Sequence, residues 1–203
     1  MTSSSDRHLV LHGLAVKKHA GAMAIADWIG LAPAAVATQL EQAVSGGRAA
    51  AAGGRFLLTP AGRLIVEAQY SRHYAAVRAD TAVAAAYARF ELVNNELKQL
   101  ITDWQTRSIA GSRVANDHAD ADYDARIIDR LGAVQERVEP VLAAFATAMP
   151  RYGRYGGMLA HALERAEDGD TAWVSDATIA SYHTVWFELH EDILRVLGRT
   201  RSE

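Results

Sequence analysis

The sequence contains no cysteine and only four prolines, and neither sign of charge dominates it. Without cysteine the chain cannot form disulfides, thiolate zinc sites or iron–sulfur clusters, and it has no cysteine nucleophile. The 21 basic and 24 acidic residues leave a formal charge of −3, which argues against a protein that coats nucleic acid along its whole length. Half of the 203 residues are hydrophobic and 22% are charged, so we expect one large or two small folded domains.

A long hydrophobic run is also missing near the start of the sequence. The first seven residues are polar, and Asp27, Gly30 and Pro33 interrupt the apolar stretch at residues 20–36. This stretch falls short of the ~20 apolar residues that span a membrane, and the polar start does not resemble a signal peptide. We therefore expect a cytoplasmic protein.

Charge is distributed unevenly along the chain. Residues 1–80 hold eight basic and five acidic side chains, a charge of +3, which leaves −6 for the remaining residues. The asymmetry favours two units with different partners, residues 1–79 and 80–203, although a difference of this size also arises by chance.

Residues 8–75 are predicted to form helices interrupted by a hairpin. Helices are expected over residues 8–19, 22–29 and 33–44, with glycines at their ends and Pro33 in the first turn of the third. Residues 48–58 are predicted to form two short strands about Gly53 and Gly54, which tolerate positive φ in a tight turn. Thr59 and Pro60 suit the cap and first position of another helix, which extends to about residue 77.

The segment Arg55-Phe-Leu-Leu-Thr-Pro-Ala-Gly-Arg63 resembles the end of the wing in MarR-like and related winged-helix transcriptional regulators. The resemblance covers residues 8–75 and implies a mainly α fold, in which a winged helix of three helices and a two-stranded wing precedes an all-helical domain. It also implies that the helix at residues 32–44 enters the major groove of double-stranded DNA while the wing contacts phosphates. The DNA-binding residues expected from it are Thr38, Gln39, Gln42, Arg48, Arg55 and Arg63.

The proposed reading helix departs from a typical DNA-binding helix in its charge. It contains no lysine or arginine, although glutamine can bind adenine through two hydrogen bonds and phosphate contacts usually supply much of the affinity. A winged helix that binds protein, or that only packs within the fold, is the alternative.

Residues 80–203 are predicted to form an all-helical dimerisation or ligand-binding domain. Apolar side chains recur at helical spacing from Phe90 to Trp104, and further helices are expected over residues 122–149, 157–166 and 176–197. Pro140 should kink the second helix or start a new one. Residues 108–120 lack periodicity and are predicted to be a linker.

Two candidate ligand sites lie in this second unit. Asp120, Asp122 and Asp124 resemble the start of a calcium loop, but Ala125 and Leu131 replace the glycine and glutamate that the loop requires, so we expect no metal. Arg151, Arg154 and Tyr155 precede an expected helix and are candidates for binding a carboxylate or phosphate. The same residues are also typical of a tight turn with surface arginines.

The sequence lacks a GxSxG, GxGxxG or GxxxxGK[ST] motif, so we expect neither an enzyme nor a cofactor. Our interpretation is a homodimeric, DNA-binding transcriptional regulator that responds to a small anionic ligand. A weaker resemblance concerns His12–Lys18, Leu97–Gln105 and Phe187–Leu194. These segments are similar to helical accessory regions of phosphoenolpyruvate-utilising phosphotransfer proteins, which implies a non-DNA-binding regulatory module as the alternative.

Overall fold

The computed structural model describes residues 4–109 and 111–200 and confirms that the chain is mainly helical. It divides into two compact units. Unit 1 comprises the chain up to Ala79 and from His190 onward, and unit 2 comprises Asp80–Leu189. The division after Ala79 lies at the position where the charge changes sign. The segment from His190, in contrast, groups with the first unit although we expected it in the second.

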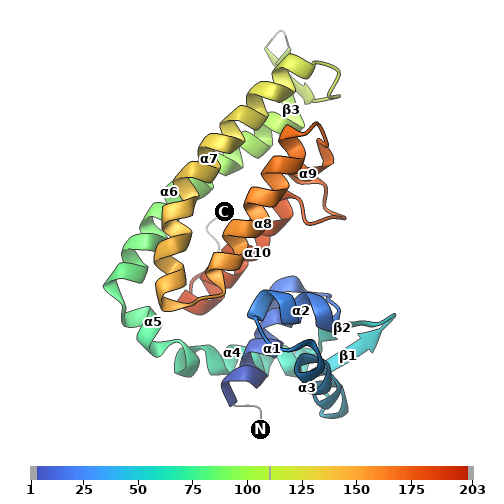
Figure 1. Cartoon of the computed structure of the whole chain (residues 1–203), viewed down its shortest axis with the longest axis vertical. Helices are drawn as coiled ribbons and strands as arrows, with labels where there is room; N and C mark the ends of the chain where they lie inside the picture. The colour runs from blue at the N-terminus through green and yellow to red at the C-terminus, as the bar shows by residue number, and fades with distance from the viewer. Residues whose placement is uncertain (1–3, 110, 201–203) are drawn as a thin grey trace. The chain divides into compact units, whose positions relative to one another are not determined.

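Unit 1 begins with three helices, α1 (Ser4–Lys17), α2 (Ala22–Ile29) and α3 (Pro33–Ser45), shown in blue in Figure 1. Gly30 ends α2 in the left-handed conformation (φ 76°), and its N–H donates to the carbonyl of Ala26. Proline occupies the first position of α3. The three helices bury a common apolar core that includes Val10, Leu14, Ile25, Trp28, Val36 and Leu40.

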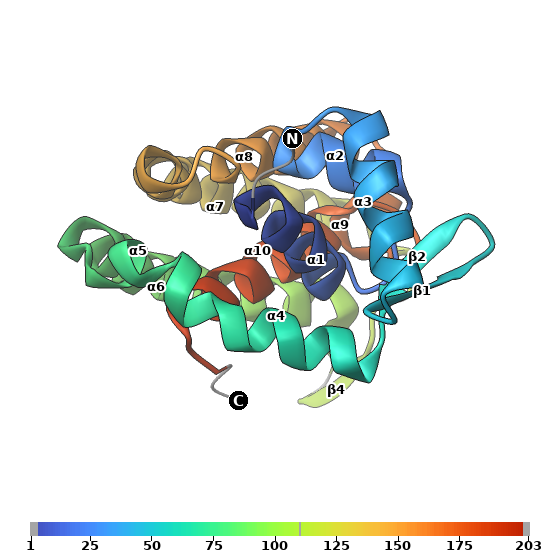
Figure 2. The ribbon, with the colours of Figure 1, turned by 90° about the horizontal axis from the view of Figure 1, so that it is seen from below.

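An antiparallel hairpin follows α3 and consists of β1 (Ala49–Ala52) and β2 (Arg55–Leu58). Ala52 pairs with Arg55 across a two-residue turn in which Gly53 and Gly54 have φ values of 57° and 75°. Positive φ at both central residues is the conformation that a tight hairpin turn requires. The predicted hairpin is thus present, and Figure 2 shows it projecting beside α3.

Unit 1 continues with α4 (Pro60–His73) and α5 (Ala75–Ala79) and ends with the last residues of α10 (Tyr182–Leu197). Thr59 caps α4, because its hydroxyl accepts from the N–H of Gly62 at 3.0 Å and donates to the Gly47 carbonyl at 2.7 Å. Gly62 lies so close to the Arg48 carbonyl oxygen that a Cβ at this position would overlap it. The helix start and the base of the hairpin are therefore fixed together.

Unit 2 contains α6 (Thr81–Gln105), α7 (Ala121–Ala148), α8 (Tyr152–Glu167), α9 (Ala172–Ser175) and the first half of α10. The long helices α6 and α7 run side by side (Figure 1). The predicted apolar stripe of α6 is buried and so belongs to the core: Phe90, Val93, Leu97, Leu100, Ile101 and Trp104.

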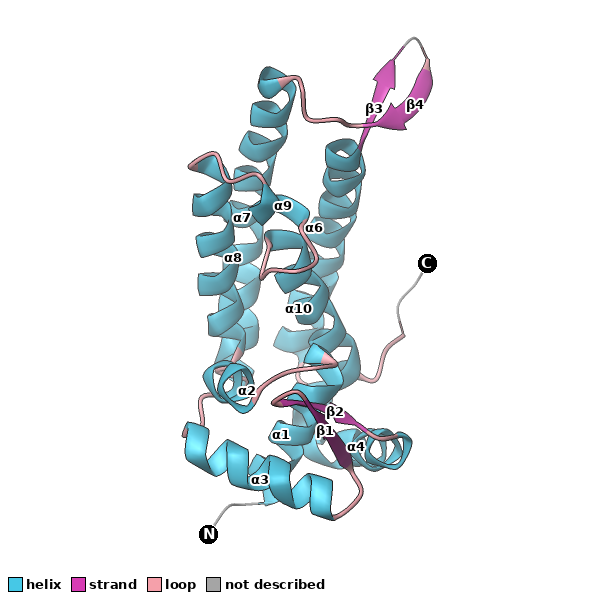
Figure 3. Cartoon of the chain, turned by 90° about the vertical axis from the view of Figure 1, so that its right-hand side faces the viewer, coloured by secondary structure: helices cyan, strands magenta, loops and turns pink. Residues whose placement is uncertain are grey.

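Two local predictions for unit 2 are wrong, and one of the two alternatives for Pro140 is excluded. The strands β3 (Thr106–Ile109) and β4 (Ser112–Ala115) pair as a second hairpin, where we expected the start of a linker; the strands of both hairpins are magenta in Figure 3. Helix α7 continues through Pro140, so no new helix starts there. Helix α8 begins at Tyr152 rather than at 157, because backbone bonds from Tyr152 and Gly153 to Met149 and Pro150 start the turn earlier.

Within the described ranges, no helix is both long enough and apolar enough to cross a membrane.

Candidate functional site

The outer face of α3 is polar and exposed. Thr38, Glu41 and Gln42 lie on it, and the Thr38 hydroxyl donates to the Ala34 carbonyl at 3.0 Å. Gln39 is only 5% exposed and shares the inner face with Val36, Leu40 and Ala43. The structure therefore brings two of the three expected base-reading residues to the surface of the helix and turns Gln39 inward.

The three expected phosphate-binding arginines have different surroundings. Arg48 is half-buried, and its guanidinium donates to the Gln42 carbonyl at 3.3 Å, so it helps to close the C-terminal end of α3. Arg55 is exposed at the first position of β2, next to the hairpin turn. Arg63 is exposed in the first turn of α4. Arg55 and Arg63 thus offer accessible positive charge on and beside the hairpin.

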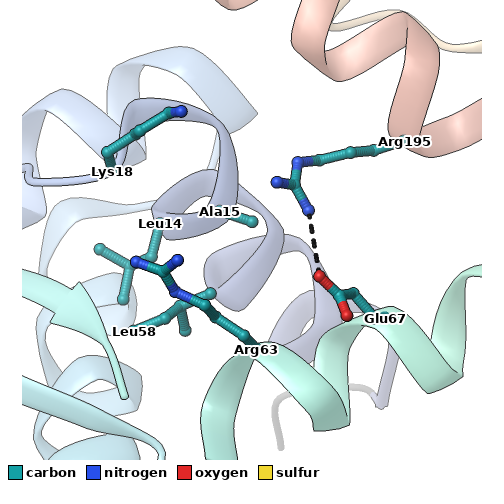
Figure 4. A pocket seen from close by; sticks show the side chains of 7 residues that line it. All are labelled: Leu14, Ala15, Lys18, Leu58, Arg63, Glu67 and Arg195. Carbon is teal, nitrogen blue, oxygen red and sulfur yellow. Dashed lines mark ion pairs between the residues drawn. The ribbon is translucent and has the colours of Figure 1, made fainter. Parts of the chain in front are cut away.

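Arg63 also lines an open hollow within unit 1, which has a cavity volume of about 70 Å³ (Figure 4). Its walls come from the end of α1, the end of β2, α4 and the last part of α10, and its lining residues are Leu14, Ala15, Lys18, Leu58, Arg63, Glu67 and Arg195. Lys18, Arg63 and Arg195 supply three positive charges, and Glu67 supplies one negative charge. The sequence alone does not indicate this hollow, because its lining residues lie up to 181 positions apart.

Arg195 forms ion pairs with two glutamates. Its guanidinium contacts Glu191 at 2.7 Å and Glu67 at 3.9 Å. Burial acts to lower the pKa of Arg195, but the neighbouring Tyr70 and Glu191 outweigh it, and the pKa is raised above its ordinary value. Arg195 therefore presents a fixed positive charge at the wall of the hollow.

A buried polar network lies in the core of unit 1. His12 approaches the Tyr70 hydroxyl through Nδ1 at 2.8 Å and the Asp192 carboxylate through Nε2 at 2.9 Å. Burial raises the pKa of Tyr70 well above its ordinary value, so its hydroxyl stays protonated. The sequence contains a faint signal of this network, because His12 and Asp192 each interrupt an apolar helical stripe. Pairing them requires knowledge of the tertiary fold.

The candidate anion residues of unit 2 do not form one exposed site. Arg151 is buried with its guanidinium 5.0 Å from the Tyr152 ring centroid, and Tyr155 is buried with its hydroxyl donating to the Glu188 carbonyl at 3.4 Å. Arg154 is exposed. All three lie at the start of α8 itself, where their segment packs against α7. The burial of Arg151 and Tyr155 therefore favours a structural role for this segment between α7 and α8 over the binding of a carboxylate or phosphate.

In the part of the chain that the structure describes, no three histidine, aspartate or glutamate side chains gather as a metal site would require. Asp120 instead caps α7 by accepting from the Tyr123 N–H at 3.0 Å, and Asp124 accepts from Asn116 at 3.0 Å. These acids therefore organise the junction between β4 and α7.

Comparison with known proteins provides no relative for the chain: no protein-family model, no curated protein and no solved structure matches it.

Proposed function

We propose that unit 1 is a winged-helix module that binds double-stranded DNA, and that the chain acts as a homodimeric transcriptional regulator. The observation that carries the proposal is the position of the exposed polar face of α3 beside a hairpin with Arg55 next to its turn. A helix and a hairpin of these dimensions suit insertion into a DNA groove and contact with the flanking backbone.

The exposed side chains of α3 have the chemistry to distinguish bases. Gln42 can form two hydrogen bonds with adenine, Glu41 can accept from the amino group of cytosine, and Thr38 can contact a base or a phosphate. Gln39 is not included among the proposed reading residues, because its side chain is buried.

The phosphate contacts are few. Arg55 and Arg63 are exposed, whereas Arg48 already binds the end of α3. Because each neutralised phosphate contributes to affinity and to its salt dependence, one copy of unit 1 should bind DNA weakly. Two copies on one duplex would provide the missing affinity, and this is the reason to propose a dimer.

Fluorescence anisotropy with labelled duplexes tests the proposal. Binding should weaken steeply between about 50 and 200 mM salt. Arg55→Ala should weaken binding to every sequence alike and lower the salt slope by about one, whereas Gln42→Ala should change the sequence preference. Arg89→Ala, an exposed arginine of α6 in unit 2, removes the same charge and should leave binding unchanged.

The second candidate is a protein-binding accessory module, such as the phosphotransfer companion that the weaker resemblance implies. One observation favours it: the exposed face of α3 contains the acidic Glu41 and no lysine or arginine. Absence of binding to long duplexes at low salt would contradict the regulator proposal and support this alternative.

A further inference from the structure

The hollow that contains Lys18, Arg63 and Arg195 combines positive charge with an apolar wall (Figure 4). Leu14, Ala15 and Leu58 contribute that wall from α1 and β2, and Leu14 and Leu58 are almost fully buried. Binding sites for organic molecules typically join an apolar surface to a few convergent polar groups. The composition of this hollow therefore suits a molecule with an anionic head and a hydrocarbon part.

Arg63 is available to bind such a head. Its guanidinium has no hydrogen-bond or ion-pair partner among the described residues, although it extends over the hollow from the first turn of α4. A guanidinium binds a carboxylate through two parallel hydrogen bonds, which gives both affinity and a fixed orientation.

Lys18 extends from the opposite side of the hollow, at the end of α1. Its backbone has φ 63°, a left-handed conformation that is uncommon for a residue with a side chain. The N–H of Lys18 donates to the Leu14 carbonyl at 2.9 Å, so this conformation closes the helix. It leaves the Lys18 side chain at the edge of the hollow, above the Arg63 guanidinium in the view of Figure 4.

We propose that this hollow is a binding site for a small aliphatic carboxylate. The carboxylate group binds Arg63 and Lys18, and the hydrocarbon chain packs on Leu14 and Leu58. Arg195 borders the site on the α10 side, where Glu191 largely balances its charge. The site is distinct from the exposed face of α3, and its occupancy is measured without DNA.

Glu67 would compete with a bound carboxylate, because it already pairs with Arg195. It is half exposed and lies 3.9 Å from the Arg195 guanidinium, at the edge of the same hollow. A carboxylate that enters the hollow is repelled by the negative charge of Glu67 and attracted by the positive side chains that line the hollow. Removing that charge should therefore strengthen binding, whereas removing an arginine should weaken it.

The test is isothermal titration of the full chain with acetate, butanoate, hexanoate, hexanamide and inorganic phosphate, with thermal shift as a second readout. Affinity should rise by up to about fourfold for each methylene that the small hollow can bury, and the gain should level off along the series because Leu14 and Leu58 leave little surface exposed. The neutral hexanamide and inorganic phosphate should bind more weakly than hexanoate. Arg63→Ala should weaken hexanoate binding about tenfold, because it removes a charge-assisted contact.

Two pairs of variants distinguish binding in the hollow from a general effect of changing the charge of the protein. Arg72→Ala removes the same charge from an exposed position of the same helix and should leave hexanoate binding unchanged. Glu67→Gln should strengthen binding by about threefold, a modest gain because solvent screens an exposed charge, whereas Glu41→Gln on α3 should not. The proposal is overturned if no ligand binds, if phosphate or hexanamide binds as tightly as hexanoate, or if Arg72→Ala weakens binding as much as Arg63→Ala does.

Discussion

His12 and Asp192 are 180 positions apart in the sequence, yet His12 Nε2 lies 2.9 Å from Asp192 Oδ1 and neither side chain is exposed to solvent. The contact joins α1 to the last part of α10 within unit 1. It explains why the segment from His190 belongs with the N-terminal helices, because a buried carboxylate and a buried imidazole each require a partner.

The surrounding bonds indicate how the protons are arranged. The Tyr70 hydroxyl is protonated and accepts from Arg195, so its own hydrogen is available for Nδ1 of His12. With Nδ1 as acceptor, the imidazole proton lies on Nε2 and is donated to Asp192. We infer a chain of hydrogen bonds from Arg195 through Tyr70 and His12 to Asp192.

Replacing Asp192 should therefore destabilise unit 1 strongly. Asp192→Ala leaves the buried His12 Nε2 without its acceptor, and the loss of one member of a buried pair costs about 3 to 5 kcal/mol. Urea denaturation followed by circular dichroism measures the change. Glu67→Ala is the control, because its ion pair with Arg195 is long and half exposed and should contribute less than about 1 kcal/mol. Equal effects of the two substitutions would contradict the network.

Replacing Gln39, in contrast, should stabilise unit 1. Its amide oxygen and nitrogen are both buried without a hydrogen-bond partner among the described residues. Gln39→Met keeps the length and the helix propensity of the side chain and removes the unpaired polar atoms. We expect the free energy of unfolding to rise by about 1 kcal/mol. Gln42→Met, on the exposed face of α3, should change it little, and a loss of stability in Gln39→Met would show that the amide has a partner.

The parts of unit 1 that the sequence predicts well are those that local chemistry determines. The glycine turn of the first hairpin, the Thr59 cap and the Pro60 helix start each depend on residues that are neighbours in the chain. The prediction that Gln39 contacts DNA is wrong, although helical periodicity alone is enough to place Gln39 on the inner face of α3. Val36, Leu40 and Ala43 already mark the inner face.

Features that depend on contacts between distant segments could not be predicted from local sequence. The pairing of His12 with Asp192 and the convergence of Lys18, Arg63 and Arg195 depend on how distant helices pack. The second hairpin was missed for a different reason. Its strands are only four residues long and β4 is exposed throughout, so they carry no apolar alternation to distinguish them from a linker.

Asp120 leads to a prediction about pH. The Tyr123 N–H and then the Arg107 guanidinium hold the pKa of Asp120 below its ordinary 3.8, outweighing desolvation. A lowered folded-state pKa stabilises the fold above pH 3.8, and this contribution is lost as the pH falls through the folded-state value. Asp120→Asn keeps an acceptor at the cap of α7 but removes the charge.

Urea denaturation at a series of pH values tests this assignment. The wild-type chain should be more stable than Asp120→Asn at neutral pH, and the difference should shrink under acidic conditions. Arg107→Gln should reproduce part of the loss at neutral pH, because it removes the 2.8 Å contact with Asp120 but leaves the cap in place. A difference that stays constant down to the acid limit would exclude the charge as its cause.

Gly62 and Gly157 make a matched pair of glycine-to-alanine substitutions, since both lie in helices but have different surroundings. A Cβ at Gly62 would overlap the Arg48 carbonyl oxygen, which is backbone and cannot rotate away, whereas a Cβ at Gly157 would meet no other atom within 4 Å. Gly157→Ala should therefore stabilise the chain by up to about 1 kcal/mol through helix propensity alone. Gly62→Ala should destabilise it, because α4 must separate from the base of the hairpin, and should weaken DNA binding if the hairpin contacts the duplex. Thermal unfolding measures both changes, and a stabilising effect of Gly62→Ala would contradict the close approach of α4 to Arg48.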